Sequence, residues 1–418
     1  MKIRYTSNLL YQILFAICVA VTYLNIYELT FGVWVLTFLV TLRPTYSWRI
    51  VKYVLCFTAI FLIALVSSFY NEYKTYNFFR DVTYMVKPVL GLLVGYQLCR
   101  NMNIKPFHTI LYTGLFIAVV HLGMILYSMA IYRIINIHEL RHHTGYFSDF
   151  EIYACIVLCF HKAFEIRLTR QKLWLFAAIL AFSSFLYLAR TGFIQFFVLY
   201  LAMRGYLRLT KRSIIIISSI VIATVASYTV IYNMNFTRNG KGLEGLMYKI
   251  KNAPIEAFKT KIDADDWRDF NDNYRSYENI ITVNQVSYQG TGKILFGKGM
   301  GATVDLGRKL WTNDGEFIRY LPTLHNGYMT VYLKSGLTGI FFYLLFLYFL
   351  SRQGKSDIPI VQKVNLLLSG TSIFLILGTW VLLGFYLKID NKSLIVGLIL
   401  AYKEITTRQA SKQLQHAA

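Results

Sequence analysis

The sequence predicts an all-α, polytopic integral membrane protein with about twelve transmembrane helices and one long polar segment. Hydrophobic residues make up 56% of the 418 residues, and only 15% are charged, whereas soluble domains average about 25% charged residues. Apolar stretches of roughly 20 residues, the length that crosses a bilayer as a helix, recur along most of the chain. The net charge is nevertheless +22, from 43 Lys and Arg against 21 Asp and Glu.

This composition excludes two classes of protein. A large soluble enzyme would carry more charge of both signs on its surface. A disordered basic tail would contain far fewer apolar residues. Two classes remain, a basic nucleic-acid-binding protein and a membrane protein with cationic loops, and the positions of the charges distinguish them.

Twelve apolar stretches are predicted to span the membrane: 9–27, 29–42, 50–70, 82–99, 107–132, 150–165, 173–189, 192–207, 213–233, 337–351, 364–386 and 392–403. The expected organisation is therefore transmembrane helices 1–9 in residues 1–233, a polar segment over 234–336, helices 10–12 in 337–403 and a tail over 404–418. The N-terminal stretch lacks a convincing small-residue cleavage site, so we expect the first span to be retained.

Basic residues cluster in the connections that twelve spans place on the N-terminal side of the membrane. They include Arg43, Arg49, Lys52, Lys162, Arg167, Arg170, Lys172, Arg204, Arg208, Lys211, Arg212, Arg352, Lys355 and Lys363. Cytoplasmic loops carry this excess, so both ends should lie inside and the polar segment outside. That segment is almost neutral, with fourteen basic and eleven acidic residues. The surplus charge thus reports topology and contact with anionic lipid, and nucleic acid is not an expected partner.

Arg190 is the first candidate site residue. It lies at the outer end of a predicted span, against the inside bias of basic residues. An ionisable group at membrane depth needs a partner, and no acid lies nearby in the sequence. A snorkelling side chain or a surface ion pair is the structural alternative.

The polar segment contains two further candidate arginines and a glycine-rich turn. A helix is expected to start near Asp272, and Arg268 and Arg275 are seven residues apart, so they could share a helix face. Either could instead be a solvated charge. Further on, three alternating glycines could approach a phosphate closely or form a tight turn: Gly297, Gly299 and Gly301.

His325 and Asn326 precede the tenth span. The sequence after them predicts an amphipathic helix at the outer interface, then a break at Gly336, then the span. A neutral imidazole at this place could act as a general base, or it could simply cap the helix. A second group of histidines lacks organised carboxylates and is expected to be a solvated loop without metal: His138, His142 and His143.

The order of these motifs resembles the O-antigen ligase/polymerase superfamily of bacterial envelope glycan assembly. The resemblance covers most of the chain and is strongest over 185–345. It rests on Arg190-Thr191-Gly192 at an outer span end, the Arg-bearing helix, the glycine turn, and His325-Asn326 ahead of a Gly-x-x-Gly span. The motif from Arg141 to Phe147 is similar to a family loop, although Ser148-Asp149-Phe150 replaces the Pro-Asn that often follows.

The resemblance implies a metal-independent, cofactor-free glycosyltransferase. Its donor would be an oligosaccharide on polyprenyl (undecaprenyl) pyrophosphate, presented at the outer face of a bacterial inner membrane. Arg190 and Arg275 would bind the pyrophosphate, and His325 would act as the general base of an inverting transfer. Arg268 stays an alternative to Arg275. The other implied substrate-loop residues are Arg141, Arg268, Gly297, Gly299, Gly301 and Asn326.

The acceptor stays open at this level. A surface-polysaccharide polymerase, which extends the glycan, is favoured over an O-antigen ligase, which transfers it to lipid A-core, and a protein O-oligosaccharyltransferase is a third relative. A transporter of the same lipid is the alternative from another class. A metal-dependent lipid-sugar transferase would place acids in an early outer loop, where only Glu28 occurs. The sequence leaves open whether a chain-length regulator also binds.

Overall fold

The computed structural model describes residues 2–102, 105–134, 136–145, 148–207, 210–237, 243–263, 265–311 and 317–417. These residues are mainly helical, as predicted, and include one two-stranded antiparallel sheet. The helices before the polar segment are α1 (Lys2–Ala20), α2 (Tyr27–Val40), α3 (Trp48–Ser68), α4 (Thr75–Met102), α5 (Pro106–Ile131), α6 (Ile137–Thr144), α7 (Asp149–Cys159), α8 (Arg170–Leu186), α9 (Arg190–Met203) and α10 (Lys211–Asn233).

The remaining elements belong to the polar segment and to the C-terminal helices. They are α11 (Leu243–Phe258), α12 (Trp267–Asp272), α13 (Tyr274–Ser287), α14 (Thr291–Phe296), β1 (Val304–Trp311), β2 (Phe317–Leu321), α15 (Gly327–Ser351), α16 (Pro359–Val381) and α17 (Lys392–Ala417). Each of the twelve predicted apolar stretches overlaps a helix. Among the described residues, six helices are long and apolar enough to cross a membrane, namely α3, α4, α5, α10, α15 and α16. The structure therefore agrees with the predicted class, a helical membrane protein.

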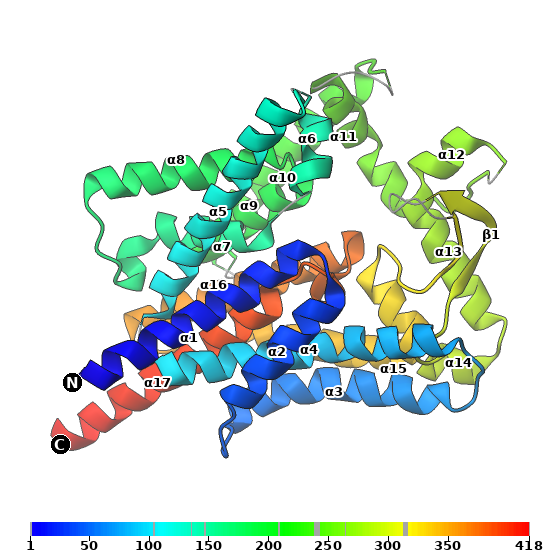
Figure 1. The fold of residues 1–418 in the computed structure, drawn as a ribbon. Helices are drawn as coiled ribbons and strands as arrows, with labels where there is room; N and C mark the ends of the chain where they lie inside the picture. The colour runs from blue at the N-terminus through cyan, green and yellow to red at the C-terminus, as the bar shows by residue number, and fades with distance from the viewer. Residues whose placement is uncertain are drawn as a thin grey trace.

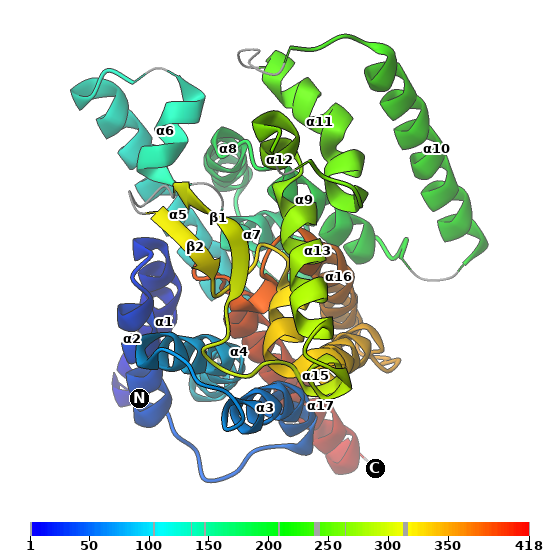
Figure 2. The ribbon, with the colours of Figure 1, turned by 90° about the vertical axis from the view of Figure 1, so that its right-hand side faces the viewer.

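The helices form a bundle with the two termini at one end (Figure 1). Helices α12 and α13 and strand β1 lie at the opposite end. The most apolar window of α4 is 72% buried, whereas that of α10 is 0% buried. Helix α4 is therefore a central helix of the bundle, and α10 lies at its periphery (Figure 2).

Helices α4 and α17 pack very closely. A Cβ atom on Gly95 would lie 2.1 Å from the Leu394 carbonyl oxygen, and one on Gly397 would lie 2.1 Å from the Leu92 carbonyl oxygen. Small residues of this kind let helix backbones approach each other inside a membrane, where the hydrophobic effect does not drive association. Larger side chains at either glycine would force the two helices apart.

Buried charges join three of the helices. The Lys392 Nζ atom at the start of α17 lies 2.7 Å from Asp149 Oδ2 at the start of α7, and it also pairs with Asp390. Lys87 of α4 donates to the Leu387 carbonyl oxygen at 2.6 Å. Buried charges need partners. Lys392 finds two carboxylates and Lys87 a backbone carbonyl, and these contacts hold α4, α7 and the segment leading into α17 together.

The polar segment contains a β-hairpin that the sequence analysis did not predict. Strands β1 and β2 pair antiparallel, with Val304 opposite Leu321 and Trp311 opposite Phe317. The side chain of Gln285 on α13 bonds both the N–H and the C=O of Asp305 on β1, at 3.0 and 2.6 Å. Two short strands are only marginally stable alone. Packing on α13, a tertiary contact, is what stabilises them.

Helix α15 confirms the predicted glycine break and corrects the prediction for the turns before it. Gly336 has φ 65° and ψ −162°, which interrupts the helical backbone. The preceding turns were expected to lie at the membrane interface as an amphipathic helix. Instead Val331, Leu333 and Lys334 are fully buried, because this half of α15 packs against α14 and α3.

Candidate functional site

His325 is held by a buried carboxylate. Its Nδ1 atom lies 3.0 Å from both carboxylate oxygens of Glu278, and its backbone N–H donates to Glu278 Oε2 at 3.1 Å. The Glu278 side chain is 1% exposed, whereas that of His325 is 50% exposed. Asn326, the next residue, caps α15, since its Oδ1 accepts the N–H groups of Tyr328 and Met329. The histidine is thus fixed at the start of a helix.

The geometry fixes which nitrogen of His325 can accept a proton. An ionised carboxylate only accepts hydrogen bonds, so Nδ1 carries the hydrogen that it donates to Glu278. In the neutral ring the lone pair therefore lies on Nε2. Half of the His325 side chain is exposed, whereas Glu278 covers its Nδ1 side. Glu278 would also stabilise the imidazolium that forms when Nε2 takes a proton, as the carboxylate of a catalytic triad does.

Tyr274 completes this arrangement. Its ring meets the His325 ring edge-on, with centroids 5.7 Å apart. Burial, together with the nearby Glu278 carboxylate, raises the pKa of the Tyr274 phenol well above its usual range. The tyrosine hydroxyl therefore stays protonated beside Glu278.

Arg275 lies one helical turn before Glu278 on α13. Residues three apart are neighbours on a helix surface, so α13 carries the arginine and the carboxylate side by side. The Arg275 Nη1 atom lies 3.5 Å from Glu256 Oε1 on α11. Arg190, the first residue of α9, lies close enough to Glu256 and Arg275 for their charges to act on it. Helix α13 thus carries both Arg275, which pairs with Glu256, and Glu278, which holds His325.

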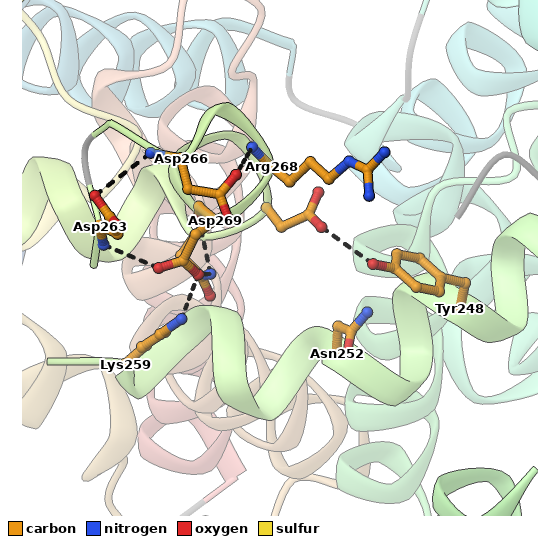
Figure 3. A pocket seen from close by; sticks show the side chains of 9 residues that line it. Tyr248, Asn252, Lys259, Asp263, Asp266, Arg268 and Asp269 are labelled. Atoms are coloured by element: carbon orange, nitrogen blue, oxygen red, sulfur yellow. Dashed lines mark hydrogen bonds and ion pairs between the residues drawn. The ribbon is translucent and has the colours of Figure 1, made fainter. Parts of the chain in front are cut away.

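Arg268 lies elsewhere, on α12. Asn273 has φ −115° and ψ 21°, which separates α12 from α13. The prediction that Arg268 and Arg275 share one helix face is therefore wrong, since an extra break divides the helix. Arg268 lines a cavity of about 360 Å³ between α11 and α12, where Tyr248 donates to Asp272 at 3.1 Å (Figure 3).

The turn of Gly297, Gly299 and Gly301 uses its backbone groups within the protein. All three glycines have positive φ, at 75°, 88° and 80°. Four consecutive N–H groups donate to protein acceptors, those of Lys298 (to Leu333 O), Gly299 (to Lys334 O), Met300 (to Ser68 Oγ) and Gly301 (to Asp81 Oδ2). Of the two interpretations from sequence, this geometry favours the tight turn over the phosphate cradle.

The loop motif around Arg141 is described only in part. Arg141 lies on α6, which packs against α5. Tyr146 and Phe147 of the same motif lie outside the described residues, and so does the side chain of His138. The five cysteines are free thiols.

Sequence reasoning missed three residues of the site, namely Glu278, Tyr274 and Glu256. Glu278 and Tyr274 flank Arg275 on α13, and the three- and four-residue spacing of a helix could have indicated them. Glu256 lies on a separate helix and carries no such local signal.

The fold and this site define a helical protein with helices long and apolar enough to cross a membrane, and with a carboxylate–histidine pair whose glutamate lies on the same helix as Arg275. Comparison of the sequence with protein-family models and with curated proteins finds no match.

Proposed function

We propose that this protein is an inverting glycosyltransferase that moves a saccharide from polyprenyl pyrophosphate to an acceptor hydroxyl. The observation that carries the proposal is the Glu278–His325 pair beside Arg275 and Arg190. A general base and permanent cations are the two elements that this reaction needs. We favour a surface-polysaccharide polymerase of the O-antigen ligase/polymerase superfamily, with transfer to lipid A-core as the alternative acceptor reaction.

The proposal includes a topology. Twelve spans in the inner membrane of a bacterium would put both termini in the cytoplasm and the polar segment, 234–336, at the periplasmic face. The position of the termini at one end of the bundle, opposite α12 and α13, supports this arrangement (Figure 1). Such a site would receive a lipid-linked donor from the outer leaflet and an acceptor from the periplasm.

In the proposed reaction the acceptor oxygen attacks the anomeric carbon of the donor. His325 Nε2 takes the hydroxyl proton, and the bond between the anomeric carbon and the pyrophosphate oxygen breaks. The electron pair leaves with the pyrophosphate, where Arg190 and Arg275 neutralise the growing charge. Attack opposite the leaving group inverts the anomeric centre. Glu278 stabilises the imidazolium, and Tyr274 keeps Glu278 in position.

Reconstitution tests the proposal. Purified protein in liposomes with a polyprenyl pyrophosphate oligosaccharide should lengthen the glycan, and gel electrophoresis measures the product. Supplying lipid A-core as the acceptor distinguishes a ligase from a polymerase. Movement of the lipid between leaflets, with no transfer of the glycan to any acceptor, would contradict the enzyme proposal and support a transporter.

Replacing Arg275 by lysine should lower the transfer rate about 10- to 100-fold. A lysine keeps the charge but cannot form the two parallel hydrogen bonds of a guanidinium, and a charged hydrogen bond contributes about 1.5–3 kcal/mol. Arg268→Lys is the matched comparison, because Arg268 lies on α12 by the separate cavity. Greater loss in Arg268→Lys than in Arg275→Lys would reverse the assignment of the two arginines.

Replacing Glu278 by glutamine should lower the transfer rate about 100-fold or more, because the amide removes the charge that stabilises the imidazolium and can favour the wrong tautomer. Binding of inorganic pyrophosphate by the same variant should be unchanged, since the arginines remain. An unchanged rate would remove Glu278 from the mechanism. Tyr274→Phe should cause a smaller loss, because it removes only the hydroxyl beside Glu278.

A further inference from the structure

Glu256 is the acidic partner of Arg275 in the candidate site. Its carboxylate lies 3.5 Å from Arg275 Nη1, and its charge also acts on Arg190. The side chains of Glu256 and Arg275 are 25% and 33% exposed. The ion pair is therefore partly shielded from water but still reachable by a ligand.

The position of Glu256 is set by its backbone. The Ser276 hydroxyl on α13 donates to the Glu256 carbonyl oxygen at 2.6 Å, and Ser276 directly follows Arg275. This bond joins the C-terminal part of α11 to the helix that carries the site. It therefore fixes the position of the Glu256 backbone relative to the helix that carries Arg275.

We propose that Glu256 competes with the lipid pyrophosphate for Arg190 and Arg275 and thereby promotes product release. This inference rests on the proposed function. Two like charges placed close together repel, and the Glu256 carboxylate offsets that repulsion while no donor is bound. A bound pyrophosphate displaces the carboxylate, because it offers more negative charge and more acceptor oxygens to the two guanidinium groups.

The competition matters for product release because the product carries more negative charge than the donor. Transfer of the saccharide converts a doubly substituted pyrophosphate into one with a free terminal phosphate. A phosphate monoester has a second pKa of about 6, so the product carries additional negative charge at neutral pH. The arginines would hold this product more tightly than the donor. Return of Glu256 to the arginines compensates for the lost anion and lets the product leave.

The test is the affinity for inorganic pyrophosphate, measured by calorimetry on the full-length protein in detergent micelles. Glu256→Gln should bind pyrophosphate about fivefold more tightly than the natural protein, the effect of removing an ion pair of ordinary strength. Glu244→Gln is the matched control. It removes the same charge from the same helix, where Glu244 is exposed and bonds Thr237, and it should leave the affinity unchanged.

Unchanged or weaker pyrophosphate binding by Glu256→Gln would overturn the inference, provided that the variant has the same melting temperature as the natural protein. If it melts earlier, Glu256→Ala replaces it, with the same expected result. Arg190→Ala and Arg275→Ala separate this failure from that of the proposed function. If both arginine variants lose pyrophosphate binding and Glu256→Gln gains no affinity, the competition by Glu256 is excluded but the anion site is supported. Full binding in both would remove the anion site itself.

Discussion

Replacing His325 by alanine is expected to lower the transfer rate by about 10²- to 10⁴-fold, the usual contribution of a general base. The loss follows from the geometry, since Glu278 holds Nδ1 and leaves Nε2 as the proton acceptor. Binding of inorganic pyrophosphate should be unchanged, because the arginines are intact. Transfer by the reconstituted protein, followed with a labelled lipid-linked oligosaccharide, measures the effect.

His143→Ala is the matched control for this prediction. His143 is exposed on α6 and stacks on Tyr132, with ring centroids 5.3 Å apart. Its removal should leave the rate near that of the natural protein. Near-normal transfer by the His325 variant, at normal expression, would exclude the general-base role.

Replacing Asp81 by alanine is expected to destabilise the protein by about 3–5 kcal/mol, the cost of leaving a buried charge without its partner. Asp81 pairs with Lys334, and both side chains are 1% exposed. Asp81 also accepts the N–H of Gly301 at 2.7 Å. The substitution therefore loosens both α15 and the glycine turn. The melting temperature in detergent should fall strongly.

Two further variants define the origin of that effect. Arg80→Ala removes the second ion pair of Asp81, at 3.0 Å. It leaves the fully buried Lys334 partner in place, so the loss should be smaller than that of Asp81→Ala. The double variant Asp81→Leu with Lys334→Met removes both buried charges and should recover part of the stability. A melting temperature unchanged by Asp81→Ala would show that the pair does not support the fold.

The sequence predicts the helices well because their signals are local. A bilayer-length apolar run needs no knowledge of its neighbours, and the break at Gly336 follows from the residue itself. The site is predictable only in part. Glu278 and His325 are 47 residues apart, and Glu256 and Arg275 lie on different helices, so neither pairing leaves a pattern in the chain.

The predictions that were wrong also depend on contacts between residues far apart in the sequence. A hydrophobic pattern cannot distinguish burial against protein from burial at a lipid interface, which is why the first turns of α15 were misplaced. The β-hairpin depends on the contact between Gln285 and Asp305. A single non-helical residue, Asn273, separates two helices that the spacing of arginines suggested were one.

Helix α10 is the element through which the thickness of the bilayer would affect the site. It is 23 residues long, and none of its most apolar window is buried by protein. In a membrane, lipid tails would surround it, and a mismatch between its length and the bilayer thickness would change its tilt. Tyr228 on α10 donates to the Lys251 carbonyl oxygen on α11 at 2.9 Å, and α11 carries Glu256. Vesicles with longer or shorter acyl chains therefore offer a way to adjust turnover without changing a single residue.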